Sequence, residues 1–275
     1  MGIPDSARRA GVSRVAAWSC GADGPGAVER HVHAYYCDTR SIDQAQYGAL
    51  ARRLSADERG RADALWRSDD RRDYVAAHAL LRRAMAISTG QAPEHLVFER
   101  DGNGKPFLVQ TGPVPASPHF SLSHSHDLVA CVISRTCAVG IDVEVVNPAL
   151  DVQRLAMRYF TADEAAALQR WSAEERPSRF CELWSLKEAL LKATGIGPTT
   201  SIDSVSFRVD GGQVSLTLAP PGIATDWTFA LLDVGRSHTL AIAAGARASR
   251  PRVIPVTPVE VLEGSFGRER CNPAP

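Results

Sequence analysis

The feature that most constrains the fold is a pattern of helix signals that occurs twice along the chain. Residues 54–58 read Leu-Ser-Ala-Asp-Glu and residues 160–164 read Phe-Thr-Ala-Asp-Glu, and each segment is a capping box that opens a helix. About twenty residues after each box an amphipathic pattern begins, and it ends in Thr-Gly at Gly90 and at Gly195. The chain therefore predicts the same pair of helices in two places.

A strand, a turn and a second strand follow each long helix, with similar sequences at residues 97–102 and 206–211. Matches in the same order indicate duplication of one α+β unit. We therefore expect an α+β fold of two similar halves, residues 1–135 and 136–247, packed as an intramolecular pseudo-dimer. Ligand sites concentrate at domain interfaces, so a ligand cleft is expected between the halves. Residues 248–275 turn to Arg, Pro and Gly and predict an exposed or disordered tail.

Composition excludes several classes of function. The formal net charge is +0 and the pI is about 7.1, so bulk electrostatics predict neither a nucleic-acid groove nor a membrane surface. The six cysteines have no CxxC pair or zinc spacing and are interpreted as reduced thiols. No apolar run approaches the roughly 18 residues of a membrane span, and the first residues lack the apolar stretch of a signal peptide. A cytoplasmic protein is expected.

One helix carries charge where a core helix would not. Residues 179–197 have apolar positions at helical spacing, yet they include Lys187, Glu188 and Lys192. Glu188 and Lys192 are four residues apart and share a face, while Lys187 lies one step round the helix. These charges could meet one ligand. The alternative is a solvated ion pair, which contributes only about 0.3–0.5 kcal/mol.

A short strand supplies two further carboxylates. Residues 137–146 are apolar except for Asp142 and Glu144, which alternation places on one face of the strand. Two acids on one face repel each other unless a cation lies between them, and paired carboxylate oxygens are the usual arrangement for Mg²⁺. With Glu188 as a third oxygen ligand, the sequence predicts a magnesium site made by Asp142, Glu144 and Glu188 in the second half.

These residues carry a resemblance to a known family. Gly-Ile-Asp-Val-Glu at 140–144, followed by Trp-Ser-Leu-Lys-Glu-Ala-Leu-Leu-Lys at 184–192, resembles the paired signature of the 4′-phosphopantetheinyl transferases, in particular the larger Sfp type. Gly-Lys-Pro at 104–106 and Phe-Ser-Leu-Ser-His at 120–124 match two further elements of that family. The resemblance covers about residues 54–244 and implies the fold of this family.

The resemblance also assigns roles to individual residues. It implies that Glu188, Lys192 and His124 are catalytic, with Glu188 taking a proton directly or through water. The residues expected on coenzyme A, from the resemblance and the charge pattern together, are Arg61, Arg100, Lys105, Ser121, Ser123, His124, Asp142, Lys187, Glu188 and Lys192. Arg82 or Arg83 could serve the nucleotide end instead of Arg61, and the sequence does not decide between them. Ser121 stands where the family usually has Asn or Thr, and Ile196 stands at a position that is often basic.

The implied activity is magnesium-dependent transfer of the phosphopantetheine arm of coenzyme A to a serine of an acyl or peptidyl carrier protein, with release of 3′,5′-ADP. The implied form is a monomer. One rival is a duplicated domain that binds carrier proteins without catalysis, although the retained charges argue against it. A second rival is a different coenzyme A-using or nucleotide-using transferase, which the lack of a P-loop or GxGxxG motif weakens. Which carrier protein is served does not follow from the sequence.

Overall fold

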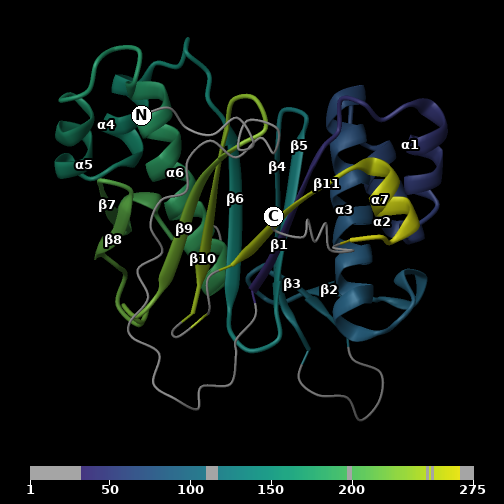
Figure 1. Cartoon of the computed structure of the whole chain (residues 1–275). Helices are drawn as coiled ribbons and strands as arrows, with labels where there is room; N and C mark the ends of the chain where they lie inside the picture. The colour runs from purple at the N-terminus through teal and green to yellow at the C-terminus, as the bar shows by residue number, and fades with distance from the viewer. Residues whose placement is uncertain (1–31, 110–116, 197–199, 246–247, 249–250, 267–275) are drawn as a thin grey trace, which may run out of the picture.

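The computed structural model describes residues 32–109, 117–196, 200–245, 248 and 251–266 (Figure 1). The first half contains β1 (Val32–Asp38), α1 (Gln44–Ala51), α2 (Ala56–Asp63), α3 (Ser68–Thr89), the 3-10 turn η2 (Pro93–His95), β2 (Phe98–Arg100), β3 (Pro106–Leu108), β4 (His119–Ser125) and β5 (Leu128–Ser134). The second contains β6 (Val139–Val145), α4 (Val152–Tyr159), α5 (Ala162–Leu168), α6 (Arg176–Thr194), η3 (Ile202–Ser204), β7 (Ser206–Asp210), β8 (Gln213–Leu218), β9 (Thr228–Val234) and β10 (His238–Ala244). The last elements are β11 (Arg252–Val256) and α7 (Pro258–Glu263).

The two halves repeat the same order of elements, as the sequence predicts. Ser55 and Glu58 form a complete capping box at the start of α2, and Thr161 and Glu164 form one at the start of α5. The long helices α3 and α6 both end at a glycine in the left-handed conformation, with φ of 74° at Gly90 and 68° at Gly195. The expected α+β fold is confirmed.

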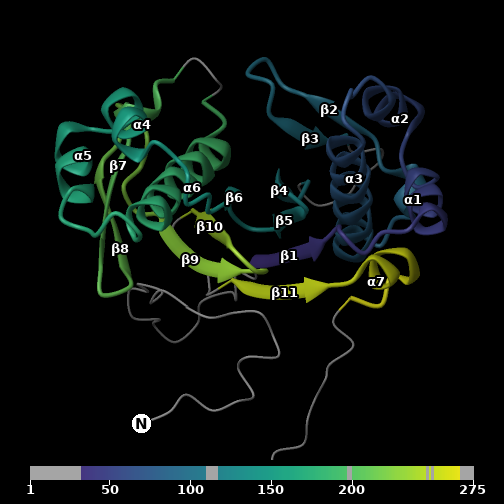
Figure 2. The same cartoon turned by 90° about the horizontal axis from the view of Figure 1, so that it is seen from above.

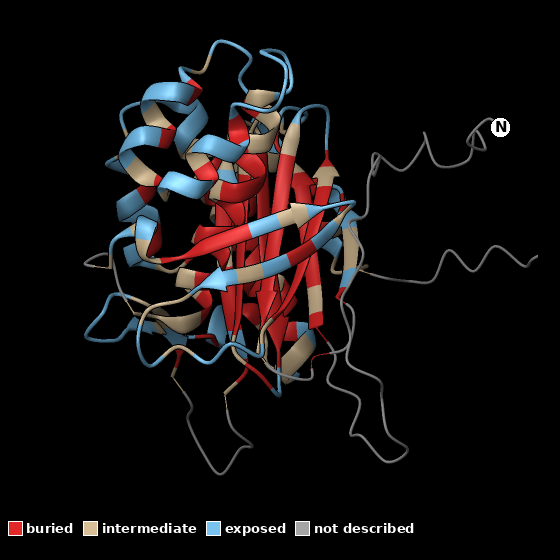
Figure 3. Cartoon of the chain, turned by 90° about the vertical axis from the view of Figure 1, so that its left-hand side faces the viewer, coloured by how far each residue is buried: buried red, intermediate tan, exposed pale blue. Residues whose placement is uncertain are grey.

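Two sheets form the centre of the molecule. Their strand orders are β11-β1-β5-β4 and β6-β10-β9, so β1-β5-β4 corresponds to β6-β10-β9 in the repeat. Helix α3 packs on the first sheet and α6 on the second, each with a hydrophobic core of its own, at opposite sides of the molecule in Figure 2. A third core joins one face of each sheet, including Ala34, Ile141 and Ile242. Figure 3 shows the resulting buried centre and the exposed outer helix faces.

Strands β4 and β6 lie side by side where the two halves meet, although no backbone ladder joins these two described strands. Serine hydroxyls replace the ladder. Ser123 Oγ accepts a hydrogen bond from the Val143 N–H at 3.3 Å, and Ser125 Oγ accepts one from the Val145 N–H at 3.2 Å. The backbone donors of β6 are thereby satisfied by side chains of the other half.

The expectation of a disordered tail at residues 248–275 is wrong for residues 251–266. Strand β11 pairs in parallel with β1, from His33 opposite Arg252 to Cys37 opposite Val256. Helix α7 opens with a further capping box, Thr257 and Glu260, and packs against α1 and α3. The strand is short and contains a proline, so its pattern is weak, and only the open edge of β1 makes it a strand. Residues 267–275 lie outside the described residues.

Two smaller expectations concern cysteines and membranes. Cys37, Cys131, Cys137 and Cys181 are free and buried, in agreement with the interpretation as reduced thiols, while Cys20 and Cys271 lie outside the described residues. In the part of the chain that the structure describes, no helix combines the length and hydropathy needed to cross a membrane.

We predict that truncation after residue 250 destabilises the protein, contrary to what a disordered tail would imply. It removes the buried side chains of Val256 and Val261, each contributing about 1.5–3 kcal/mol when buried. It also exposes an edge of β1. The melting temperature should fall by roughly 6–12 °C in a thermal unfolding experiment. A truncation after Phe266 keeps β11 and α7 and is the control; equal melting temperatures for the two variants would contradict the prediction.

Candidate active site

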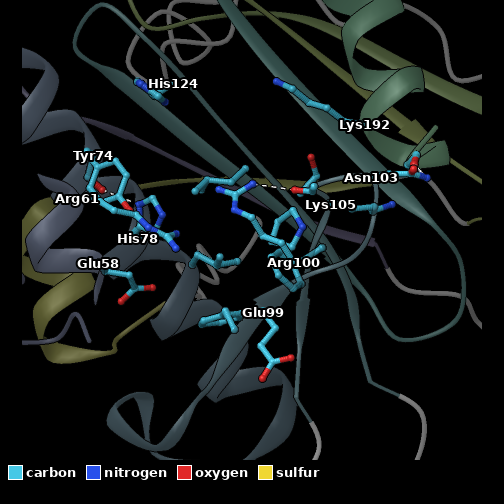
Figure 4. A pocket seen from close by; sticks show the side chains of 18 of the residues that line it. Glu58, Arg61, Tyr74, His78, Glu99, Arg100, Asn103, Lys105, His124 and Lys192 are labelled. Carbon is cyan, nitrogen blue, oxygen red and sulfur yellow. Dashed lines mark hydrogen bonds between the residues drawn. The ribbon is translucent and has the colours of Figure 1, made fainter. Parts of the chain in front are cut away.

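A cavity of about 1190 Å³ opens between the two halves (Figure 4). The first half lines it with residues from α2, α3, the β2–β3 hairpin and β4, and the second half lines it mainly with α6. The predicted site residues that line it are Arg61, Arg100, Lys105, Ser121, His124, Glu188 and Lys192. The expected cleft between the halves is therefore present, and it is lined by residues of opposite charge.

Gly140 explains how α6 reaches this position. A Cβ atom added to Gly140 would lie 2.0 Å from the Ala189 carbonyl oxygen and 2.6 Å from the Ala193 backbone nitrogen, so only glycine allows this approach. The backbone of α6 consequently rests directly on β6. This contact brings Glu188 and Lys192 on the helix next to Asp142 and Glu144 on the strand.

An ion pair between a half-buried lysine and a buried aspartate occupies the centre of the contact. Lys192 Nζ donates to Asp142 Oδ1 at 2.6 Å, and it donates to Ser123 Oγ at 3.2 Å. Ser123 Oγ in turn donates to Asp142 Oδ1 at 2.9 Å. Asp142 is 3% exposed, and its Oδ2 atom is buried without a hydrogen-bond partner. A buried carboxylate oxygen with no partner can accept a further cation or donor.

The other two predicted metal ligands lie close enough to affect one another. Burial, the Asp142 carboxylate and the Glu188 carboxylate raise the pKa of Glu144 to about 7, while Ser125 donates to Glu144 Oε2 at 3.2 Å. Burial also raises the pKa of Glu188. The Lys192 ammonium group opposes this rise, and the Asp142 carboxylate adds to it. Three mutually repelling carboxylates and an unpartnered Oδ2 have the chemistry that suits Mg²⁺. Among the described residues, however, no group of three or more His, Cys, Asp or Glu side chains is arranged to hold a metal ion.

Three arginines are candidates for the nucleotide end of the ligand, and they differ in whether protein atoms already hold their guanidinium groups. Arg82 is 2% exposed and donates to Glu58 Oε2 at 2.8 Å, as well as to the carbonyl oxygens of Pro93 and Leu96. Arg83 points away toward α7, where its Nη2 donates to the Leu262 carbonyl oxygen at 3.0 Å. Arg61 lines the cavity beside Tyr74.

The turn after β2 contacts the end of α6. Lys105 Nζ donates to the Ala193 carbonyl oxygen at 2.6 Å, and Asn103 Nδ2 donates to the Gly195 carbonyl oxygen at 3.0 Å. Burial lowers the pKa of Lys105. Arg100 Nη1 donates to the Gly104 carbonyl oxygen at 2.7 Å, which braces the same turn. These contacts hold two predicted cations at the cavity wall.

Two predicted residues of β4 also reach the cavity. Ser121 is buried and His124 is exposed, and both line the cavity from the strand that borders β6. Ser123 lies between them but faces Asp142 and Lys192 instead. Strand alternation places His124 on the face of β4 that carries Phe120 and Leu122, which also line the cavity, and it places Ser121 and Ser123 on the opposite face.

The structure contradicts the prediction that Lys187 binds coenzyme A. Lys187 is completely buried, and its Nζ lies 2.7 Å from Glu164 Oε2. It also donates to the carbonyl oxygens of Ile202 and Val205. Helical spacing shows that Lys187 faces away from Lys192, but it does not show that α5 and η3 cover that face. Lys187 corresponds in the repeat to Arg82, which pairs with the capping-box glutamate of the first half in the same way.

Aromatic residues of the cavity were missed. Tyr74 and His78 stack with ring centroids 3.9 Å apart on α3, and Trp184 packs edge-on against Tyr159 at 5.5 Å. Tyr74 and His78 are four residues apart, a spacing that places both on one helix face. The histidine four residues after Tyr74 is the sequence signal that this face of α3 is not wholly apolar.

Two protein-family models match the chain, one in each half. The model described as the 4′-phosphopantetheinyl transferase superfamily matches residues 138–243. The model described as 4′-phosphopantetheinyl transferase, N-terminal, matches residues 41–136. The chain therefore belongs to the 4′-phosphopantetheinyl transferase superfamily, and the resemblance seen in its motifs is confirmed.

Individual relatives carry the same description. The chain is 34% identical over 158 residues to the 4′-phosphopantetheinyl transferase HetI of Nostoc sp. strain PCC 7120. This match covers 56% of this chain and 65% of the relative. It is 37% identical over 150 residues to psf-1 of Bacillus pumilus, covering 54% and 61%. It is 29% identical over 191 residues to a 4′-phosphopantetheinyl transferase of Bacillus subtilis, covering 68% and 80%. The matched part spans slightly less than two thirds of the first two relatives.

We predict that Lys187→Met lowers stability rather than ligand affinity. The substitution leaves the Glu164 carboxylate buried without its ammonium partner, and breaking a buried pair in this way costs about 3–5 kcal/mol. Chemical denaturation should show this loss, and the double variant with Glu164→Gln should lose less than the sum of the two single changes. Unchanged stability together with weaker coenzyme A binding would restore the ligand role for Lys187.

Proposed function

We propose that this protein transfers the 4′-phosphopantetheine arm of coenzyme A to a serine hydroxyl of an acyl or peptidyl carrier protein. The apo carrier becomes the holo carrier, and 3′,5′-ADP is released. The observation that carries the proposal is the cavity between two halves that each match the family, because it gathers Arg61, Lys105, Glu188 and Lys192 around one space. Cations suit a diphosphate, and a carboxylate suits a proton acceptor.

The reaction replaces the phosphoanhydride bond of coenzyme A with a phosphodiester bond to the carrier serine. The serine oxygen forms a bond to the phosphorus that carries the pantetheine arm, and the bond from that phosphorus to the bridging oxygen of the diphosphate breaks. The bridging oxygen leaves with 3′,5′-ADP, and the serine proton passes to a base. Charge neutralisation and in-line placement are the main requirements of such a step.

Glu188 is the proposed base. Its carboxylate lines the cavity, and burial raises its pKa, which makes it a better proton acceptor than an exposed glutamate. Transfer to the carboxylate is direct or through one water. Lys192 and His124 are the proposed catalytic cations, because they reach the cavity from the two halves and would balance charge that develops on the phosphoryl oxygens.

Magnesium is proposed to bind Asp142, Glu144 and Glu188. When bound, Mg²⁺ would neutralise charge on the diphosphate and help to align it. The unpartnered Asp142 Oδ2 atom and the raised pKa of Glu144 support a cation at these carboxylates. Lys192 partly fills that electrostatic role for Asp142 in this structure.

The remaining proposed coenzyme A contacts come mainly from side chains that line the cavity. Arg61 is proposed for the 3′-phosphate, because the guanidinium groups of Arg82 and Arg83 are held by protein atoms. Lys105 and Arg100 are proposed for the diphosphate from the β2–β3 turn. The hydroxyl groups of Ser121 and Ser123 complete the predicted set, with Ser123 acting through Asp142 and Lys192.

We further propose that the protein acts as a cytoplasmic monomer. Both walls of the cavity come from one chain, so a second copy is not needed to complete the site. The four free buried thiols of the described residues are typical of a reducing compartment.

One assay tests the proposed function. The protein is incubated with coenzyme A and an apo carrier protein, with Mg²⁺ or with a chelator, and the carrier is measured by intact mass spectrometry. We expect a mass gain equal to the phosphopantetheine arm, which the chelator abolishes and added Mg²⁺ restores. Carrier binding without a mass gain would identify the non-catalytic rival, and transfer of another part of coenzyme A would identify a different transferase.

We predict that Glu188→Gln slows transfer by about 10²–10⁴-fold, the loss typical of a missing general base. Glutamine keeps the volume and helix propensity of glutamate but removes its charge and its basicity. Single-turnover transfer at saturating coenzyme A and Mg²⁺ measures the effect, because saturation removes the binding contribution. A rate within about threefold of the parent would rule out Glu188 as the general base.

We predict that Arg61→Ala raises the KM for coenzyme A and changes the maximal rate much less, because Arg61 binds the end of the ligand far from the reacting phosphorus. With dephospho-coenzyme A, which lacks the 3′-phosphate, parent and variant should have similar KM values. Arg59→Ala, on the same helix but outside the cavity lining, is the control. An equal loss with both substrates would show that Arg61 does not contact the 3′-phosphate.

A further inference from the structure

The turn between β4 and β5 has an unfavourable backbone. Among the described residues, His126 and Asp127 are the only non-glycine residues with positive φ, at 36° and 66°. They form a two-residue hairpin turn, since Ser125 pairs with Leu128. Turns of this kind strongly favour Asn-Gly or Asp-Gly, because most side chains crowd the backbone at positive φ. His and Asp tolerate positive φ better than most residues, but they are less favourable here than Asn-Gly, so contacts from the surroundings help to hold this conformation.

Side chains and backbone from three other elements hold this turn. The Asp127 N–H donates to Asp73 Oδ2 at 3.1 Å, and the Asp127 carboxylate forms an ion pair with Arg72. The Asp127 carbonyl oxygen accepts from the Thr39 N–H at 2.8 Å. His238 Nε2 lies 3.0 Å from the Ser125 carbonyl oxygen and 2.9 Å from that of His126, so Nε2 carries the proton that it shares between them.

Asp73 is the hub of this network. It lies on α3, is 4% exposed, and also accepts a hydrogen bond from the Thr39 hydroxyl group. Arg72 Nε lies 3.5 Å from Asp73 Oδ1. One buried carboxylate therefore fixes the turn directly through the Asp127 N–H and indirectly through its neighbours. None of these contacts belongs to the cavity lining, so the network has no role in ligand contact.

The turn immediately follows the part of β4 that reaches the cavity. His124 is two residues before His126 and lines the cavity. On the side of β6, this end of β4 has no backbone ladder and is held by the Ser125 hydroxyl group. On the other side the ladder with β5 ends at Ser125 and Leu128. His124 is paired with Val129, one pair before the end of this ladder, so the turn helps to set the twist of the hairpin at the position of His124.

We propose that Asp73 is a positioning residue that holds the turn at His126 and Asp127 in its left-handed conformation, so that the His124 imidazole stays at the cavity rim in place for an anionic ligand. The proposal rests on the proposed function insofar as that ligand is the diphosphate of coenzyme A. Asp73 acts through His124 and does not touch the ligand. Substitution of Asp73 should affect ligand binding because His124 moves. If the turn sequence is replaced by one that adopts positive φ unaided, Asp73 should become dispensable.

The test compares Asp73→Ala with a triple variant that adds His126→Asn and Asp127→Gly, the turn sequence that adopts positive φ unaided. Asp73→Ala should raise the KM for coenzyme A about tenfold, as expected for a misplaced charge-assisted hydrogen bond. The triple variant should return the KM to within about threefold of the parent, although Asp73 is still missing. All assays are run well below the melting temperature of each variant.

A matched control separates positioning from general destabilisation. Val75→Ala removes buried volume from the same helix, α3, and lowers stability without touching the turn. Its KM should remain within about threefold of the parent. A KM for Val75→Ala that rises as much as that of Asp73→Ala would overturn the proposal. Failure of the triple variant to restore the KM would overturn it as well.

A second readout does not depend on activity. In ¹⁵N-histidine NMR spectra, the ring nitrogen signals of His124 should shift in Asp73→Ala and return in the triple variant. If the parent protein transfers nothing to a carrier, the proposed function fails while this readout still decides the positioning role; unchanged His124 signals in Asp73→Ala would overturn that role. Should Asp73→Ala fail to fold, Asp73→Asn keeps the side-chain volume and leaves only one oxygen to accept from the Asp127 N–H and the Thr39 hydroxyl group, and it must shift the same signals.

Discussion

The close contact between the backbones of α6 and β6 at Gly140 is the constraint on which the site depends. A helix that rests on a strand at this distance has no room for a side chain between them, so its own charged residues lie beside those of the strand. The Lys192–Asp142 pair and the raised pKa values of Glu144 and Glu188 all follow from this approach. Hydrophobic packing thus brings like charges together, and the resulting repulsion is the electrostatic basis for binding a cation there.

Each half contains a buried ion pair at the equivalent position, and the cation differs between the halves. In each half the glutamate of a capping box turns inward and pairs with a cation on the long helix, Arg82 in the first and Lys187 in the second. In each half that cation also donates a hydrogen bond to a backbone carbonyl oxygen of the 3-10 turn after the helix, which fixes the position of the turn. Each 3-10 turn contributes a residue to the cavity lining, Glu94 in the first half and Ile202 in the second, so the buried pairs help to shape the site although neither cation is free to bind a ligand.

Local signals in the sequence predicted much of this arrangement. Capping boxes, glycine stops and the alternation of strands gave the repeat and placed Asp142 and Glu144 on one face, because these features depend on residues a few positions apart. Lys187 was assigned wrongly, since helical spacing defines a face but not what covers it. The position of β11 was missed for a similar reason: a short segment with a proline becomes a strand only beside the open edge of β1. The Asp73 network was equally invisible, because it joins residues from separate elements that share no pattern.

The parallel pairing of β11 with β1 also affects the order in which the protein can fold during synthesis. The strands come from opposite ends of the described chain, so the first half leaves the ribosome with one edge of β1 unpaired. At usual translation rates that edge stays open for on the order of ten seconds before β11 emerges. During this interval the exposed edge can pair with other chains. The pairing of β11 therefore closes, late in synthesis, an edge that favours aggregation while it is open.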